Sequence, residues 1–288
     1  MPKITMRQLI INADDLGMSH EVNQQIEECI NIGCITSSTL MANAPAFDEG
    51  VRIAKQYPHI SVGVHLNLIE YAPLTNSDVF KKYGIVGENG CFIEGAIFNV
   101  PIEEALKKAI HEEWDAQISK IEMMGLSPTH CDSHEHTHTI LDLQEVLCQV
   151  MDKHHIKRVR RRVVPSIRLM LRAKRQVETI QIGKKVEIQP KKRNVIYRRF
   201  HLFVVKYQSW RWNNNLAKKY SMTNSFSSFR DFYLNRDILY LGGENSSIEL
   251  MCHPGNKFFD SETNCLMNDE SWFNDSYELI SYHQLKSE

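Results

Sequence analysis

The 288-residue chain lacks several features that would assign it to other classes of protein. Its first residues carry no long apolar run after their basic side chains, so we expect no signal peptide. No segment approaches the roughly 20 apolar residues of a membrane-spanning helix. The chain also has no internal repeat, no low-complexity linker and no clear domain boundary. We therefore predict one domain over residues 1–288, without a membrane span.

The seven cysteines form no C-x-x-C pair and are scattered along the chain. An odd, scattered set without a signal peptide is typical of reduced thiols, so we expect a cytoplasmic protein. Cys131 and Cys252 each lie beside a candidate site residue. Because strand alternation turns neighbouring side chains to opposite faces, we expect both thiols to face the core and not to bind a metal.

The net charge of −1 gives the molecule no strong overall field, but the charge is unevenly distributed. Residues 151–212 hold 19 Lys and Arg against 3 Asp and Glu, a net of +16, and the remainder carries −17. Such a block can bind nucleic acid, an acidic membrane surface or an anionic substrate. It contains no recognisable nucleic-acid motif, so we favour a solvated helical face that offsets an acidic body, and we expect no nucleic-acid partner.

Short apolar strands alternate with helices along the first half of the chain, which predicts a parallel sheet. The expected strands are Gln8–Ala13, Ile35–Ala42, Ile60–Leu68, a fourth at the histidine-rich segment near residue 130, Lys157–Arg161, Met222–Phe226, Ser247–Cys252 and Tyr277–Tyr282. The expected helices are His20–Ile32, Ala46–Tyr57, Pro101–Met124 and Leu141–Lys153, with a mostly helical region from Pro165 to Lys219. Residues 70–100 form a long loop, which is usually functional. A single α/β barrel-like domain fits this order.

The densest chemical signal is the segment Thr129–His138, T-H-C-D-S-H-E-H-T-H. Imidazole is the commonest metal ligand and a frequent acid–base group near neutral pH. On an extended chain the alternate residues would share one face, which holds His130, Asp132, His134, His136 and His138. The alternative is a solvated histidine-rich turn, or a tract that binds metal adventitiously.

Polar side chains stand at four predicted strand ends, and functional sites of parallel α/β folds form at the carboxyl ends of strands. The four are Asp14-Asp15, His65-Leu66-Asn67, Asp132-Ser133-His134 and His253. Each alone has an ordinary interpretation: two aspartates can cap a helix, and a lone histidine in an apolar strand is often a buried, satisfied one. Because polar residues occur at all four of these strand ends, we favour a functional site over four separate ordinary interpretations.

Five ordered blocks resemble the YdjC-like carbohydrate deacetylase family, whose best-known member is chitooligosaccharide deacetylase. They are N-A-D-D-L-G-M-S (12–19), I-T-S-S-T-L-M-A-N (35–43), V-G-V-H-L-N-L (62–68), S-P-T-H-C-D-S-H-E-H-T-H (127–138) and I-E-L-M-C-H-P-G (248–255). The resemblance implies a distorted (β/α) barrel of the glycoside hydrolase/deacetylase type that hydrolyses an acetyl group from an N-acetylated sugar with a divalent metal. It does not extend over residues 165–245, and the tail after His253 is short; either region could shape the sugar pocket or a homodimer surface.

By this resemblance, Asp15, His65 and His134 would bind one divalent ion, with His136 as the rival to His134. Asp14 would be the general base and His253 the general acid. Asp132 could orient one of the metal-binding histidines. A purely structural role is an equal alternative for both Asp132 and His130. Arg160 could hold a substrate hydroxyl or carboxylate, or form an ordinary ion pair.

The sequence does not decide which metal is bound, and it leaves two rival functions as alternatives. Imidazole–carboxylate sets suit Zn, Co, Ni or Fe, whereas Mg is often assigned in this family. One rival function is a glycosidase with paired carboxylates, such as Asp14 with another acid. The other is a non-catalytic sugar- or polyanion-binding protein that uses the basic block.

Overall fold

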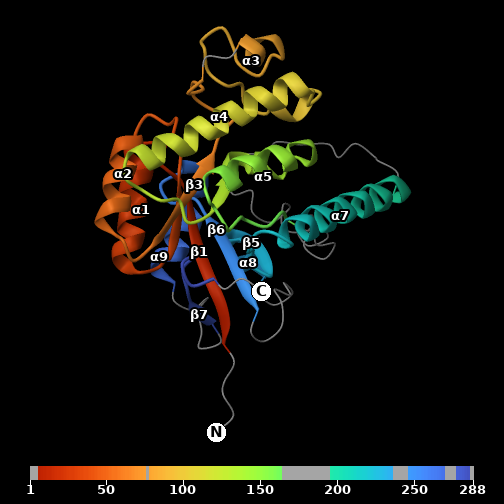
Figure 1. Ribbon diagram of the computed structural model, residues 1–288. Helices are drawn as coiled ribbons and strands as arrows, with labels where there is room; N and C mark the ends of the chain where they lie inside the picture. Colours follow the sequence, from red (N-terminus) through yellow and green to blue (C-terminus); the bar gives the residue numbers. More distant parts are fainter. Residues whose placement is uncertain (1–5, 76–77, 164–194, 236–245, 270–276, 286–288) are drawn as a thin grey trace, which may run out of the picture.

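The computed structural model describes residues 6–75, 78–163, 195–235, 246–269 and 277–285 (Figure 1). Its strands are β1 (Arg7–Leu16), β2 (Ser37–Leu40), β3 (Ser61–Leu66), β4 (Cys131–Ser133), β5 (Ser225–Ser228), β6 (Ser247–Cys252) and β7 (Tyr277–Leu279). Its α-helices are α1 (His20–Ile32), α2 (Phe47–Gln56), α3 (Asp78–Lys82), α4 (Glu104–Met123), α5 (Gln144–Lys153), α7 (Val195–Ala217), α8 (Phe229–Asn235) and α9 (Asp260–Asn268). Short 3-10 helices are η1 (Ala96–Asn99), η2 (His134–Thr139), η3 (Leu141–Leu143) and η4 (Lys257–Phe259).

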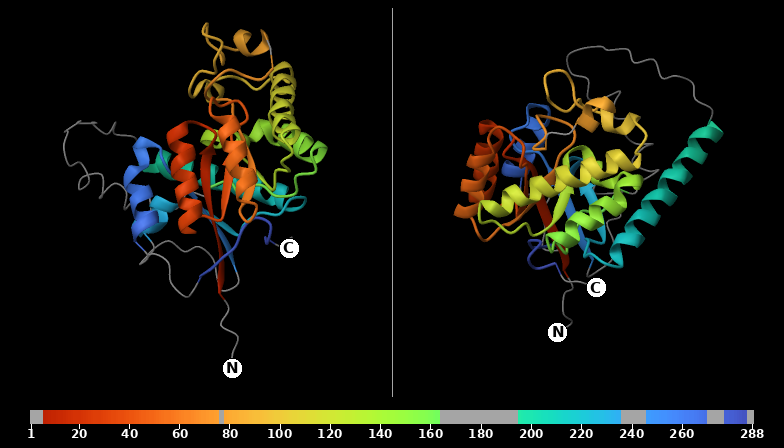
Figure 2. Two further views of the ribbon diagram at one scale, coloured as in Figure 1. Left: turned by 90° about the vertical axis from the view of Figure 1, so that its left-hand side faces the viewer. Right: turned by 45° about the horizontal axis from the view of Figure 1, so that its top comes forward.

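The strands form one parallel sheet in the order β4-β3-β2-β1-β6-β5, and β7 pairs with the start of β1. Two isolated bridges extend this path, because Cys131 pairs with Val159 and Arg158 pairs with Ser221. Ser221 leads into β5, so the hydrogen-bonded path returns through β6 to β1. The predicted distorted (β/α) barrel is therefore confirmed, and Figures 1 and 2 show helices packed around its outside.

Strand alternation separates the apolar side chains of the barrel from the polar ones. On β1, Leu9, Ile11 and Ala13 join the main hydrophobic core under the helices. Ile10 instead packs with the C-terminal residues Ile280, Tyr282 and Leu285 in a second cluster. Asn12 and Asp14 follow Ile10 at the next two alternate positions of β1, so alternation puts these buried polar side chains on the inner side of the strand. Apolar side chains therefore fill one end of the barrel interior. Polar side chains line the other end, toward the carboxyl ends of the strands.

Both predicted core-facing thiols lie where alternation puts them. Cys131 and Cys252 are free, fully buried and part of the main hydrophobic core. The first helix also has its predicted bounds. The Ser19 hydroxyl accepts a hydrogen bond from the Val22 amide at its start, and Gly33 ends it in the left-handed region at φ 81°, where a residue without a Cβ is favoured.

Three predicted strands differ from those of the structure. Residues 157–161 make only single bridges on each side, because β4 and the chain at Ser221 offer no continuous ladder. The strand expected from Met222 begins at Ser225, since the Asn224 side chain accepts from the Ser247 amide and occupies the edge before it. The last strand stops at Leu279, where the chain turns inward with the Gln284 amide bonded to the Ser281 carbonyl.

The region predicted as helical from 165 to 219 is described only from Val195, where α7 begins; residues 164–194 lie outside the described residues. The helices α3 and α8 were not expected from the sequence. The single-domain organisation stays a prediction.

Candidate metal centre

The two adjacent aspartates of β1 point to different parts of the barrel mouth because the strand is irregular there. Its register against β2 shifts between Ala13 and Leu16, and Asp15 has a left-handed backbone at φ 69°. Side chains other than glycine rarely adopt this region, and such backbone strain gathers at functional sites. Asp14 therefore stays on the inner face of the strand, and Asp15 turns its carboxylate toward β3 and β4. Both carboxylates are almost fully buried.

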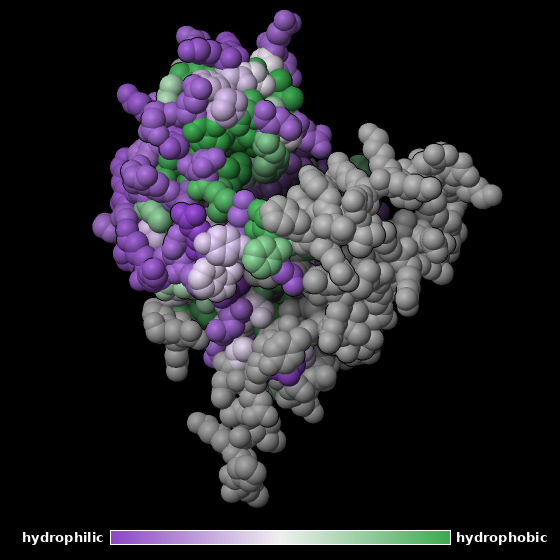
Figure 3. All heavy atoms as spheres, turned by 90° about the vertical axis from the view of Figure 1, so that its right-hand side faces the viewer, coloured by the Kyte–Doolittle hydropathy of each residue, from purple (hydrophilic) through white to green (hydrophobic). Residues whose placement is uncertain are grey.

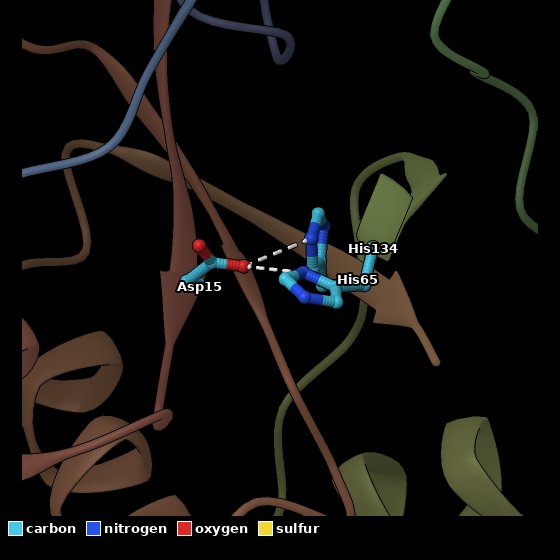
Figure 4. A group of neighbouring side chains, drawn as sticks. All are labelled: Asp15, His65 and His134. Atoms are coloured by element: carbon cyan, nitrogen blue, oxygen red, sulfur yellow. Dashed lines mark hydrogen bonds and ion pairs between the residues drawn. The ribbon is translucent and has the colours of Figure 1, made fainter. Parts of the chain in front are cut away.

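Three side chains from three strand ends meet at one carboxylate oxygen (Figure 4). His65 Nε2 lies 3.2 Å from Asp15 Oδ1, and His134 Nδ1 lies 2.9 Å from the same oxygen. One donor atom of each residue lies within 4.8 Å of the others, close enough for a single ion to join them. The donor set of two imidazoles and a carboxylate suits a borderline divalent cation. These residues therefore fit the metal that the sequence implies.

A second carboxylate fixes the orientation of His65. His65 Nδ1 donates to Asp132 Oδ1 at 2.6 Å, and Asp132 is fully buried. This bond leaves Nε2 directed at Asp15, the arrangement in which a metal-binding histidine is held by a carboxylate behind it. Burial disfavours the imidazolium, but Asp132 and Asp15 together raise the pKa of His65 to about 10. Binding of a cation would displace the proton held between His65 and Asp15.

Arg160 lies fully buried between three carboxylates, with which it forms ion pairs. Its Nη1 and Nη2 donate to both oxygens of Asp14 at 2.7 and 2.6 Å. Nη2 also lies 2.8 Å from Asp132 Oδ2, and Nε donates to Glu249 at 2.7 Å. The geometry is that of an ion-pair centre, and the guanidinium holds the pKa of Asp14 well below its usual range in spite of the opposing effect of burial.

The position of Arg160 also decides between two groups of ligating side chains. Asp14, His65 and Asp132 form a second close cluster. The Arg160 guanidinium bonds both aspartates of that cluster, and its positive charge opposes a cation there. The group around Asp15 forms no ion pair with a guanidinium among the described residues, so it is the better candidate for a metal site.

The other histidines of the 129–138 segment do not reach Asp15. The shared face expected for the extended segment is wrong beyond Ser133, because β4 ends there and Glu135 and His136 are left-handed, at φ 49° and 58°. The His136 ring packs edge-on against Phe226, and desolvation lowers its pKa to about 3. His138 bonds the Ser133 hydroxyl at 2.6 Å. The structure thus brings His134, and not His136, to the carboxylate.

His253 directly follows β6, at the carboxyl end of that strand. Its ring stacks on Phe259, with 4.4 Å between centroids. Glu262 of α9 accepts from the His253 backbone amide at 2.9 Å and lies 3.6 Å from His253 Nδ1. Burial lowers the pKa of this imidazole, but Glu262, Asp14 and Asp15 outweigh that effect and raise it. The protonated form therefore persists to higher pH than in an ordinary histidine.

Sequence reasoning missed the buried partners that hold these groups. Asn12 donates to Asp14 at 2.9 Å, and Thr39 donates to Asp132 at 3.1 Å. Tyr282 donates to Glu249 at 2.6 Å, which connects the C-terminal segment to Arg160. The sequence held a signal for three of these residues, because Asn12, Thr39 and Glu249 fall inside the five blocks that resemble the deacetylase family. Nothing in the sequence indicated Glu262 or Tyr282.

A family model covers most of the chain, and curated relatives match about half of it. A family model described as YdjC-like protein matches residues 8–280. A carbohydrate deacetylase of Geobacillus stearothermophilus is 36% identical over 150 residues, 52% of this chain and 58% of the relative. A carbohydrate deacetylase of Halalkalibacterium halodurans is 33% identical over 149 residues, 51% of this chain and 61% of the relative. The match thus spans about three-fifths of these relatives' length.

A solved structure shares the fold. It is described as a candidate cellobiose-phosphate cleavage protein from Enterococcus faecalis V583. It superposes with a TM-score of 0.69 and 21% identity, covering 97% of this chain and 99% of the other. At this identity the likeness concerns the barrel and its connections alone.

Proposed function

This chain belongs to the YdjC-like protein family, and from that premise we propose that it is a divalent-metal-dependent carbohydrate deacetylase. Its substrate would be an N-acetylated sugar or oligosaccharide, which it would hydrolyse to the free amine and acetate. The observation that carries the proposal is the convergence of His65 Nε2 and His134 Nδ1 on one oxygen of buried Asp15. The curated relatives that match about half of the chain are named carbohydrate deacetylases, which supports the same reaction.

Asp15, His65 and His134 would hold the ion. When bound, the ion would act as a Lewis acid on the acetyl carbonyl and lower the pKa of a water molecule. Asp14 would accept the proton of the attacking water, because Arg160 keeps its carboxylate ionised and fixed in direction. His253 would donate a proton to the leaving amine, because the carboxylates of Glu262, Asp14 and Asp15 raise its pKa and favour the protonated form. Asp132 would orient His65 from behind.

A glycosidase reaction is less well supported. A general acid of that class is a carboxyl group with a raised pKa, whereas the pKa of Asp14 is lowered. Glu249 has a raised pKa, but it is fully buried and its oxygens bond Arg160 and Tyr282. Neither carboxylate fits the role.

Acetate release tests the proposed function directly. We expect the protein to release acetate from at least one member of a panel of N-acetylated mono- and oligosaccharides. Chelation should abolish the release, and re-addition of Zn²⁺, Mg²⁺, Co²⁺ or Ni²⁺ singly should identify the ion. In a His65→Ala/His134→Ala variant, re-addition should restore nothing. Turnover that survives chelation, or stoichiometric metal in the double variant, would rule out this assignment.

The alkaline limb of the pH profile tests the pairing of His253 with Glu262. Because the acid form of His253 is the active one, kcat should fall as the pH rises through its pKa. Glu262 raises that pKa, so Glu262→Gln should move the limb to lower pH while the amide still offers an oxygen to the backbone. Asp260→Asn, an exposed change on the same helix, is the matched control. An unmoved limb in an active Glu262→Gln enzyme would contradict this pairing.

A further inference from the structure

The outer helix α7 is anchored to the barrel by one face of its C-terminal half. Trp212 is fully buried, and its ring lies 5.8 Å from that of His138. The Asn213 side chain accepts from the Arg162 amide at 3.0 Å and donates to its carbonyl at 3.1 Å. Leu216 is also buried. The helix lies at the outer edge of the molecule in Figure 1 and in the right-hand view of Figure 2.

The opposite face of α7 exposes three aromatic side chains. Phe203 is 69% exposed, Tyr207 54% and Trp210 57%. Their spacing of four and three residues puts them on successive turns of one face, and the rings of Tyr207 and Trp210 stack at 5.9 Å. An exposed row of large apolar groups marks an interaction surface. The side of the molecule on which α7 lies shows green and near-white areas between the hydrophilic ones (Figure 3).

The first described side chains of α7 are apolar on more than one face of the helix. Leu202, Val204 and Val205 are each partly exposed, next to the exposed Phe203. The helix was expected to present a solvated polar face. It presents aliphatic and aromatic groups beside its polar and basic ones, and removing those apolar groups from water is favourable.

The charge on this surface is all of one sign. No Asp or Glu occurs between residues 195 and 219. Lys206, Arg211 and Lys218 lie on or directly after α7, and within the described part of the chain no carboxylate forms an ion pair with them. Lys219 does pair, with Asp152. The partner of this surface is therefore anionic as well as apolar.

We propose that this surface, defined as Phe203, Val204, Lys206, Tyr207, Trp210, Arg211 and Lys218, docks on an anionic lipid bilayer. Tryptophan and tyrosine rings favour the boundary between headgroups and acyl chains, where phenylalanine and aliphatic groups insert. Lysine and arginine bind the anionic headgroups. Nucleic acid would satisfy the cations and rings but would leave the aliphatic residues in water. No described helix is long and apolar enough to cross a membrane, so α7 would lie on the surface.

Vesicle co-sedimentation of the full chain tests this docking. The protein should bind vesicles of phosphatidylglycerol and phosphatidylcholine far more tightly than vesicles of phosphatidylcholine alone, and high salt should weaken the binding. A Phe203→Ser/Trp210→Ser variant should bind at least about tenfold more weakly, because it loses two inserting rings. A Lys206→Gln/Arg211→Gln/Lys218→Gln variant should lose roughly a hundredfold, at about fivefold for each charge near an anionic surface.

Matched controls separate docking from general effects. Phe258→Ser removes a 92% exposed aromatic group outside α7, and Lys55→Gln/Lys81→Gln/Lys82→Gln removes three exposed charges on α2 and α3. Both should keep vesicle binding, and all variants should keep their fold by circular dichroism and their acetate release from a soluble sugar. Equal binding by the α7 and control variants would overturn the proposal. A dimer that the α7 variants convert to monomer, or single-stranded RNA binding without vesicle binding, would overturn it in favour of a second copy or a nucleic acid.

Discussion

Asp14→Asn is expected to lower kcat by about 10²–10⁴-fold, the usual contribution of a general base, while leaving metal affinity almost unchanged. Asp14 is bonded to Arg160 and Asn12, and neither of its oxygens is the one on which the two histidines converge. An asparagine can keep one accepting oxygen for Arg160, so the fold should survive. Metal affinity by isothermal titration and kcat at saturating metal are the two measurements.

Asp15→Asn is the matched comparison on the neighbouring residue. It removes the carboxylate to which His65 and His134 point, so it should weaken metal binding first, and excess metal should restore part of the activity. Because the two carboxylates are adjacent and almost equally buried, general effects of charge removal are shared by both variants. If excess metal rescues Asp14→Asn and not Asp15→Asn, the two roles are reversed.

Arg160→Gln is expected to lower the free energy of unfolding of the metal-free protein by roughly 3–5 kcal/mol, the range found when one partner of a buried ion pair is removed. The change leaves Asp14, Asp132 and Glu249 together in a fully buried site without their shared cation. Urea unfolding of chelator-treated protein at neutral pH measures the loss. The kcat should fall as well, because the Asp14 carboxylate is no longer held in one direction.

Two further substitutions make the Arg160 result interpretable. Arg160→Lys keeps the charge but not the planar guanidinium that bonds both oxygens of Asp14. Compared with Arg160→Gln, it should therefore regain more of the free energy of unfolding than of kcat. Arg52→Gln breaks a surface pair with Glu27 and should leave unfolding almost unchanged. A loss for Arg160→Gln no larger than that of Arg52→Gln would mean that the buried carboxylates take up protons at little cost, which contradicts an ion-pair centre at Arg160.

The sequence by itself determined the class of fold and the neighbourhood of the site. Alternating strands and helices predict a parallel sheet, and the carboxyl ends of parallel strands meet at one edge whatever their exact lengths. The positions of Asp14, Asp15, His65 and His134 at such ends are therefore enough to group them. The same period of two turns the thiols of Cys131 and Cys252 to the core.

Only the tertiary structure decided what each group faces. The left-handed turns at Asp15, Glu135 and His136 send neighbouring side chains in different directions, and no local rule predicts that conformation for these residue types. The partners of Arg160 come from three separate strands, and the partner of His253 is Glu262 on α9, a contact that the sequence did not reveal. Side-chain direction beyond a strand end depends on one backbone torsion and on distant packing, and the period of a strand carries no information about either.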